Sequence, residues 1–373
     1  MAHSYTPGLK VLKNTEIFKE RRLPLKGQVD SKVGDEVEPC DIVAKTNLPG
    51  NVQMINVANQ LNIDANDIKD YMIKNKGEPI KKGNLMAETK GLFGFFKSSV
   101  YSPSDGTIES ISNVTGQVVL RELPIPVEID AYIKGKIKTI IPEEGVIIKT
   151  NGVFIQGIFG IGGESRGKIS VIVENRNSEL TEDKITEKER GKIIIGGSFI
   201  NLAAYKKAIK CGVAGIVVGG FNYYDLEKIL GFKLGVAITG SENNITSLIV
   251  TEGYGKIQMG QQTFDLLKDH NDQLASVNGA TQIRAGVIRP EIIIPKTKSS
   301  NNNDEIKKTV GIVEGSLVRV IRSPNFGEIG YVKKLPPELR KMESETMVRV
   351  AIVKIDKNQI EIPRSNLEIV ETE

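Results

Sequence analysis

Between residues 191 and 295, short apolar runs alternate with Gly-rich or polar segments that have the residue types of a ligand-binding edge. The runs are Ile193–Ile195, Val213–Val218, Val236–Ile238 and Leu248–Val250. Runs of β-branched residues bounded by Gly are typical of strands buried on both faces. Because the carboxyl ends of parallel strands share one edge of a sheet, where ligands collect, we expect the segments after these runs to meet.

The Gly and polar residues of these segments form the candidate ligand-binding set. It consists of Gly196, Gly197, Ser198, Gly219, Gly220, Thr239, Gly240, Glu242, Thr251 and Glu252, with Gln282, Arg284 and Arg289 added from further along the chain. Guanidinium groups suit a carboxylate or a phosphate, so the ligand would be a small anion. In the alternative that we favour, the glycines only turn the chain and the arginines pair with Glu242, Glu252 or Glu291.

Catalytic and metal chemistry have little support in the residue types. The chain has two histidines, His3 and His270, and neither has a partner at a recognisable catalytic spacing. Its two cysteines, Cys40 and Cys211, form no CxxC pair or Cys/His cluster. We therefore predict no metal site and no cofactor, and no specific reaction follows from the sequence.

Helical patterns between the apolar runs indicate the elements that would position these residues. They cover Phe199–Cys211, Tyr224–Leu230 and Gln261–Leu274, so strand alternates with helix. This alternation predicts a central α/β domain over residues 191–295, with helices flanking a parallel sheet. The phrase GKIIIGGSFINLAAYKKAIKCGVAGIVVGG resembles protease-associated or swivelling β/α domains, which implies a binding and positioning role.

The N-terminal third contains an approximate internal repeat of short strands and Gly turns. Its two halves, KVGDEVEPCDIVAKTNLPG and IKKGNLMAETK…SPSDGTIESISNVTG, resemble a biotinyl/lipoyl-like barrel-sandwich hybrid domain, which we assign to residues 25–140. In carriers of that superfamily a hairpin lysine bears the prosthetic arm, and Lys90 matches its place. The local sequence Thr89-Lys90-Gly91 departs from the carrier patterns Met-Lys-Met and Asp-Lys-Ala. We therefore favour a solvated, unmodified Lys90 and a non-carrier domain.

Three further segments separate or extend these domains. Residues 1–24 are interpreted as an N-terminal extension, and residues 141–190 as a β-rich connection. The polar, apolar-poor stretch over residues 296–309 is predicted to be a linker. An apolar cluster of the second repeat, Leu92, Phe93, Phe95 and Phe96, is either a docking loop or a plug of the barrel.

Residues 310–373 alternate short strands with turns and resemble a KOW domain, a small SH3-like barrel. The resemblance rests on Gly315, Val318, Arg319, Val320, Phe326, Gly327, Gly330 and Val332. It implies contact with RNA or with protein. The candidate contact residues are Arg319, Arg322, Lys333 and Lys334 for phosphates, with Phe326 and Tyr331 for base stacking.

The totals describe a globular chain of two or three domains. It has 373 residues, 39% hydrophobic and 26% charged, with a formal net charge of +4. No apolar run has the length of a membrane span and no signal peptide is evident, so we predict a cytoplasmic protein. The function we predict is non-catalytic binding or assembly (an adaptor) with a protein partner. The alternatives are RNA, ribosome or transcription binding through the KOW domain, and a small-anion sensor or enzyme.

Overall fold

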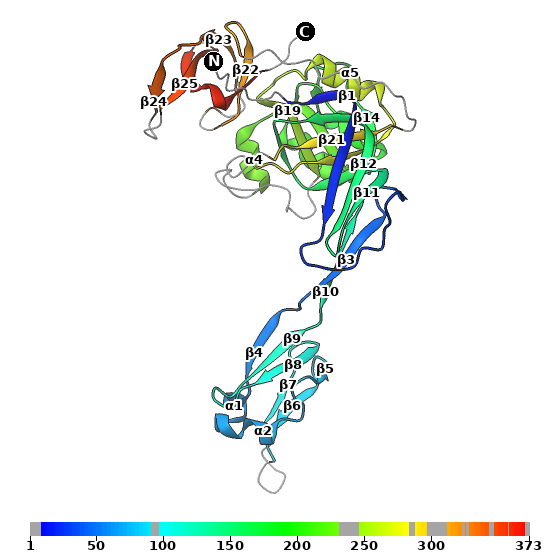
Figure 1. The fold of residues 1–373 in the computed structure, drawn as a ribbon, viewed down its shortest axis with the longest axis vertical. Coiled ribbons are helices and arrows are strands. Elements are labelled where there is room, and N and C mark those ends of the chain that lie inside the picture. The colour runs from blue at the N-terminus through cyan, green and yellow to red at the C-terminus, as the bar shows by residue number, and fades with distance from the viewer. Residues whose placement is uncertain are drawn as a thin grey trace.

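The computed structural model describes residues 9–90, 97–230, 246–282, 288–296, 312–322, 325, 328–342, 347–356 and 358–369. The protein is a strand-rich mixed α/β structure with three parts (Figure 1). The described residues within 9–41 and 131–296 form the body, and those from 312 onward form the C-terminal module, which lies beside it. The tip, residues 49–124, projects from the body on a stalk of two strands, β3 (Ile42–Leu48) and β10 (Ile125–Asp130).

One large mixed sheet runs through the body in the order β13-β19-β18-β16-β14-β20-β21-β12-β11-β2, and β1 also pairs with β12. Its parallel strands are β14 (Glu164–Val171), β16 (Ile193–Ile195), β18 (Gly215–Phe221) and β19 (Ser247–Tyr254). Its other strands are β1 (Val11–Arg22), β2 (Glu36–Val37), β11 (Gly135–Ile141), β12 (Gly145–Gln156), β13 (Phe159–Ile161), β20 (Leu274–Asn278) and β21 (Glu291–Pro295), with the short β15 (Glu179–Leu180) and β17 (Phe199–Ile200) beside β18.

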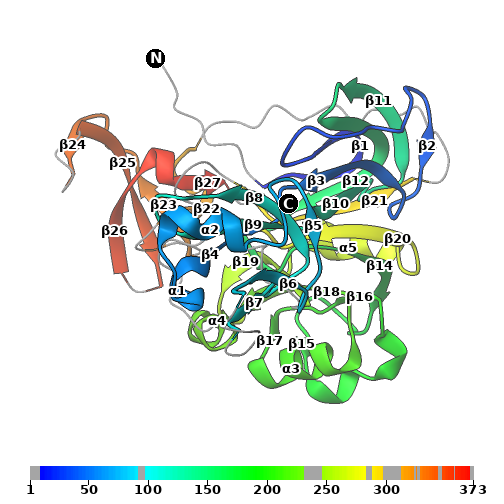
Figure 2. The same ribbon diagram turned by 90° about the horizontal axis from the view of Figure 1, so that it is seen from below.

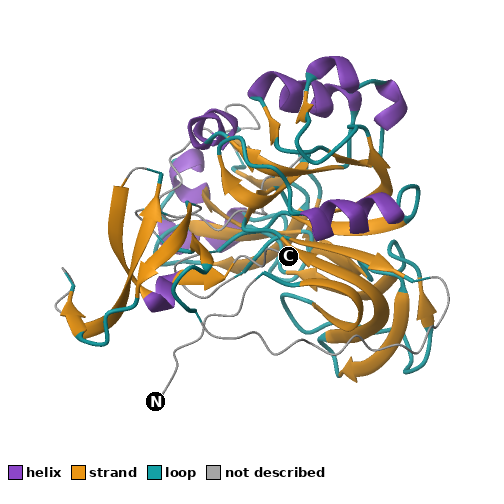
Figure 3. Cartoon of the chain, turned by 90° about the horizontal axis from the view of Figure 1, so that it is seen from above, coloured by secondary structure: helices purple, strands orange, loops and turns teal. Residues whose placement is uncertain are grey.

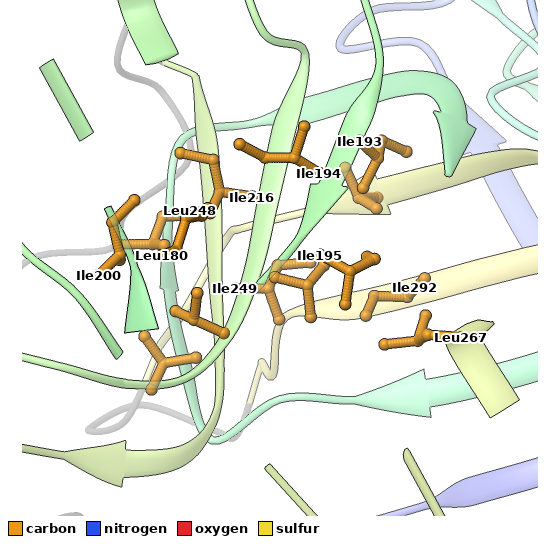
Figure 4. Packing of buried hydrophobic residues seen from close by; sticks show 14 of the residues in the cluster. Leu180, Ile193, Ile194, Ile195, Ile200, Ile216, Leu248, Ile249, Leu267 and Ile292 are labelled. Carbon is orange, nitrogen blue, oxygen red and sulfur yellow. The ribbon is translucent and has the colours of Figure 1, made fainter. Parts of the chain in front are cut away.

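Three of the parallel strands, β16, β18 and β19, are buried on both faces, whereas β14 is only partly buried. Ile193, Ile194 and Ile195 are fully buried and pack with Ile216 and Ile249 of the neighbouring strands (Figure 4). Helices α3 (Leu202–Cys211), α4 (Tyr223–Leu230) and α5 (Gln261–Asp269) accompany these strands. The body's helices gather around this part of the sheet, and the opposite side of the body consists of strands and loops (Figure 3).

Local signals set the helix ends, which differ from the predicted ones. Helix α3 begins after Asn201, whose side chain accepts a hydrogen bond from the Ala204 N–H, so Phe199 and Ile200 belong to a strand instead. Helix α5 ends at Asp269 rather than Leu274, because Asp272 has a left-handed φ of 64° and turns the chain into β20. The charged segment over residues 178–190, within the predicted β-rich connection, forms β15 followed by 3₁₀ turns at Glu182–Lys184 and Glu187–Glu189.

Two predicted segments are integral to the large sheet. Strand β1, in the supposed N-terminal extension, pairs antiparallel with β12 from Val11 to Arg22. Strands β12, β13 and β14, in the supposed connection, lie in the same sheet as the α/β segment. The body therefore joins chain segments that sequence composition had separated. The predicted linker, residues 296–309, lies outside the described residues except for Lys296.

The tip has a hydrophobic core of its own. It contains β4 (Val52–Asn56), α1 (Val57–Leu61), η1 (Ala65–Asp67), α2 (Ile68–Tyr71), β5 (Pro79–Ile80), β6 (Leu85–Glu88), β7 (Ser99–Tyr101), β8 (Gly106–Ile111) and β9 (Gln117–Glu122). Strands β4-β9-β8-β5 form one sheet, and β6 and β7 form another. Val57, Ile68, Met86, Ile108 and Leu120 are fully buried between these elements. Figure 2 views the molecule from the side of the tip.

The two sequence repeats lie in different cores. Val37 and Val43 of the first repeat pack with Ile137 and Ile148 of the body, whereas the second repeat lies in the tip. The stalk strands pair from Leu48↔Ile125 to Ile42↔Asp130 and separate the two clusters. Residues 25–140 therefore do not share a single core.

The C-terminal module is built from short antiparallel strands, as predicted. They are β22 (Leu317–Val320), β23 (Ile329–Lys334), β24 (Leu339–Lys341), β25 (Met347–Ile355), β26 (Asn358–Pro363) and β27 (Leu367–Ile369), with a 3₁₀ turn at Arg364–Asn366. The sheet order is β24-β25-β23-β22-β27, and β26 pairs with β25. Val318, Val332, Ala351, Val353 and Leu367 form its core.

Candidate functional site

Three of the four predicted segments, those at Gly196–Ser198, Gly219–Gly220 and Thr251–Gly255, meet at the carboxyl edge of the parallel strands. The Gly219 N–H donates to the Gly197 carbonyl at 2.8 Å, and the Gly255 N–H donates to the Phe221 carbonyl at 2.9 Å. Two segments differ from the prediction: Gly219 and Gly220 lie within β18, and Thr251 and Glu252 lie within β19, so neither pair is in a loop. The remaining segment lies outside the described residues. It comprises Thr239, Gly240 and Glu242, with the apolar run before them.

Close backbone packing explains why these positions are Gly. A Cβ on Gly197 would overlap the carbonyl of Ser178, one on Gly219 the carbonyl of Ile257, and one on Gly220 the carbonyl of Gly255. Gly196 likewise packs against Leu180 and Val218. The segment after β19 therefore lies across the edge where a ligand would bind, and the chain itself fills that space.

The hydroxyl groups at this edge are also engaged internally. Ser198 Oγ donates to the Asn177 carbonyl at 2.7 Å, and Thr251 Oγ1 donates to the Val218 carbonyl at 3.3 Å. Both side chains are buried. Gln282 makes a backbone bridge to Ile288, and Arg284 lies outside the described residues.

Glu252 joins the body to the C-terminal module. Its Oε1 accepts a hydrogen bond of 2.9 Å from the Gly260 N–H at the start of helix α5. Its Oε2 accepts one of 2.8 Å from Arg319 Nη2 of strand β22, and both side chains are buried. A carboxylate at a helix N-terminus beside a guanidinium is doubly stabilised. Arg319, predicted to contact phosphates, is therefore not on an open surface.

A second ion pair crosses the same junction with the charges reversed. Arg289 of the body lies 2.9 Å from Glu368 of β27, measured between Nη2 and Oε2. Glu368 is fully buried, and it faces Arg319 across the β22–β27 ladder. Glu252, Arg289, Arg319 and Glu368 thus form one cluster, called here the junction cluster. Of the glutamates predicted for it, Arg289 pairs with neither Glu252 nor Glu291, and Glu242 lies outside the described residues.

The outer surface of the C-terminal module keeps the other predicted basic residues. Arg322, Lys333 and Lys334 are exposed, and Tyr331 is 54% exposed. Tyr331 faces Lys354 across the β23–β25 ladder. Three more exposed basic residues lie on β24 and β25, namely Arg340, Lys341 and Arg349. Exposed basic side chains attract phosphates or acidic side chains, and of these Arg340 lies 3.9 Å from Glu361 of the same module. Phe326 lies outside the described residues.

A network of charges at the base of the stalk was not predicted. Arg21 contacts both Glu164 and Asp130, and Arg166 also contacts Asp130. Beside them Glu291 pairs with Lys19 and accepts a hydrogen bond from the hydroxyl of Tyr132 at 3.3 Å. Burial, with the charge of Glu291, raises the pKa of Tyr132. Three basic groups balance three carboxylates, so the network anchors the stalk without leaving a net charge for a ligand.

Lys90 is exposed and lies two residues after the end of β6, in the connection to β7. Residues 91–96, with the apolar cluster predicted to dock or plug, lie outside the described residues. Over the described ranges, no group of three or more His, Cys, Asp or Glu side chains is arranged to hold a metal ion. None of the helices in the described part of the chain has the length and apolar character needed to cross a bilayer.

Comparison with models of known protein families finds no family that the chain matches, and comparison with curated proteins finds no significant match. The resemblances to a barrel-sandwich hybrid, a KOW domain and a swivelling domain therefore remain predictions. The geometry of the molecule itself supports the functional proposal below.

Proposed function

We propose that this protein is a non-catalytic assembly protein that binds protein partners at separated surfaces. Two observations on the described residues support this. The described side chains of the predicted ligand-binding set already form internal hydrogen bonds and ion pairs at the sheet edge. The tip and the outer surface of the C-terminal module remain open to partners.

The arrangement of the tip is the observation that carries the proposal. The tip has its own core and extends from the body on two antiparallel strands (Figure 1). A small domain that projects away from the body does not supply side chains to a reaction in the body. It does place a binding surface where a second molecule can reach it.

Excision of the tip tests the proposal. Leu48 and Ile125 face each other across the stalk, so replacing residues 49–124 by Asn-Gly closes the stalk as a hairpin. The full chain and this tipless variant are each tagged, expressed in the native cells and co-purified with their partners. We expect the tipless variant to remain folded by circular dichroism and to lose a defined subset of partner proteins.

The matched control is a full chain with Lys333→Glu and Lys334→Glu, which changes the other open surface. It should retain the partners that the tipless variant loses. Identical partners for the full chain and the tipless variant, or no partner for either, would contradict binding through the tip.

RNA binding through the C-terminal module is the second candidate. The exposed Arg322, Lys333, Lys334 and Tyr331 favour it, and the burial of Arg319 removes one contact from the predicted set. Binding of a short single-stranded RNA should weaken with added salt. Each reversed phosphate contact should lower the slope of log affinity against log salt by about 0.7. The Lys333→Glu/Lys334→Glu variant should show this change and the tipless variant should not. Absence of binding at low salt would exclude this function.

A further inference from the structure

Strand β4 of the tip has one free edge. Among the described strands it pairs only with β9, and it ends the sheet β4-β9-β8-β5. Its sequence is Val-Gln-Met-Ile-Asn, without charge, Pro or Gly, and its register with β9 is regular from Val52↔Arg121 to Asn56↔Gln117. In Figure 1, β4 lies on the outside of the tip.

The register shows which backbone groups face outward. The Glu122 N–H donates to the Asn51 carbonyl at 2.9 Å, so residues 51, 53 and 55 direct their backbone groups toward β9. In an antiparallel pair the alternate residues direct theirs away from the partner. The N–H and C=O groups of Val52 and Met54 therefore point to the free edge. The two residues are 48% and 72% exposed.

Other sheet edges in the described structure are protected. Each remaining edge strand either has fewer than five residues or contains a charged residue or Pro. Strand β10 has Pro126 and Glu128, β26 has Glu361 and Pro363, and β3 has Lys45. Natural proteins use short edges, charges and Pro to prevent unwanted strand pairing. Strand β4 lacks all three, which is the pattern of an edge kept open for a partner.

We propose that an extended segment of a partner protein adds to β4 as a further strand of the tip sheet. The segment is uncharged over about five residues, with apolar side chains at alternate positions to pack beside Val52 and Met54. Its backbone completes the hydrogen bonds of these two residues. This inference rests on the proposed assembly function and assigns the tip's binding surface.

The surface beside β4 suits such a segment. Val52 faces Arg121 across the β4–β9 ladder, and Arg121 lines a shallow groove of about 310 Å³ with Pro49, Gly50 and Leu123. Arg121, which lines the groove, is paired with Glu109.

A second copy of this chain fits the edge less well. Stable protein pairs bury about 1,200–2,000 Å² in total. Along β4 the exposed apolar side chains are Val52 and Met54 only. An added peptide strand obtains its affinity from main-chain hydrogen bonds and needs less apolar surface.

The test uses a random peptide library displayed on phage and selected against the full chain. We expect peptides with alternating apolar residues, and we expect their binding to slow hydrogen exchange of the Val52 and Met54 amides. Met54→Pro removes an outward N–H, and Met54→Lys places a charge at the edge. Each should weaken binding about tenfold or more. Val114→Lys, at a position 82% exposed on the turn between β8 and β9, is the matched control and should bind normally.

Selected peptides that bind the Met54 variants as tightly as the full chain would overturn the proposal, as would failure to select any peptide that protects these amides. Concentration-dependent dimerisation abolished by Met54→Lys would also overturn it, by assigning the edge to a second copy. The tipless experiment separates this result from the broader function. If cellular partners are lost without the tip but kept by Met54→Lys, assembly through the tip stands and strand addition at β4 does not.

Discussion

The tip and the C-terminal module are both small β-rich units, yet they are attached to the body in opposite ways. The C-terminal module lies against the body through the junction cluster, where each side contributes one arginine and one buried glutamate. The tip has a separate core and continues from the two stalk strands. One unit is fixed to the body by side-chain chemistry, and the other by backbone hydrogen bonds of the stalk.

This difference indicates which unit can act independently. Buried ion pairs tolerate little misplacement, because a charge that loses its partner in the interior is costly. The two pairs of the junction cluster run in opposite directions, so a shifted C-terminal module would bring like charges together. This arrangement of charges fixes the orientation of the C-terminal module on the body. A ribbon of two strands imposes no such requirement on the tip, whose stability depends on its own core.

The largest expected effect is loss of Arg319 from the junction cluster. Arg319→Met leaves Glu252 buried with only the Gly260 N–H as partner and removes the cation that faces Glu368. We expect a loss of about 3–5 kcal/mol in the unfolding free energy of the joined body and C-terminal module. Urea unfolding measures this loss of free energy, and hydrogen exchange in β19 and β22 shows whether both units are destabilised.

Arg322→Met is the control for Arg319→Met, because Arg322 is exposed, and its effect should be within about 0.5 kcal/mol. Adding Glu252→Gln to Arg319→Met should recover part of the loss, since the uncompensated charge disappears. Equal small effects of Arg319→Met and Arg322→Met would mean that the two units are not joined through these charges.

A core substitution in the tip should destabilise the tip alone, whereas the Arg319 substitution should destabilise both the body and the C-terminal module. Ile108 is fully buried in the tip's cluster, and Ile108→Ala should cost the tip about 2–5 kcal/mol. Hydrogen exchange should accelerate in β8 and β9 and remain unchanged in β16 and β18 of the body. The matched substitution Ile194→Ala should show the reverse pattern. Acceleration in both units after Ile108→Ala would contradict an independent tip.

The sequence predicts the local elements of this fold well. The three consecutive isoleucines Ile193–Ile195 predict strand β16 with its observed bounds, and the pattern at Tyr224–Leu230 predicts α4 to within one residue. Apolar run length and helical spacing are local properties, so they are visible in a single chain. The short strands of the C-terminal module follow from turns in the same way.

The junction cluster could not be predicted, because its partners are distant in the sequence. Arg319 lies 67 positions from Glu252, and Arg21 lies 143 positions from Glu164. Charged residues in a sequence are exposed by default, and only the fold shows that these residues are paired and that Arg319 and Glu252 are buried. Strand β1 could not be predicted for the same reason. Its charged residues suggest a terminal extension, and only its pairing with β12 shows that it belongs to the sheet.

The smallest expected effect concerns the anchor of the stalk, and it depends on pH. Tyr132 follows β10 and its hydroxyl donates to Glu291 of β21. Because burial and the Glu291 charge raise its pKa in the folded state, the folded protein holds this proton more tightly than the unfolded chain does. The resulting stability is fully present below about pH 10 and is lost as the pH rises further, by up to about 1.4 kcal/mol per pH unit.

Tyr132→Phe should therefore cost only about 1 kcal/mol at pH 8, the contribution of one hydrogen bond, and should reduce the fall in stability above pH 10. Urea unfolding at pH 8 and at a pH above 10 measures both values. Tyr254, whose pKa burial also raises, supplies the matched variant Tyr254→Phe away from the stalk. If the stalk moved freely on the body, Tyr132 would titrate like an exposed tyrosine, and Tyr132→Phe would leave the pH dependence unchanged. The base of the stalk would then be as independent of the body as the tip.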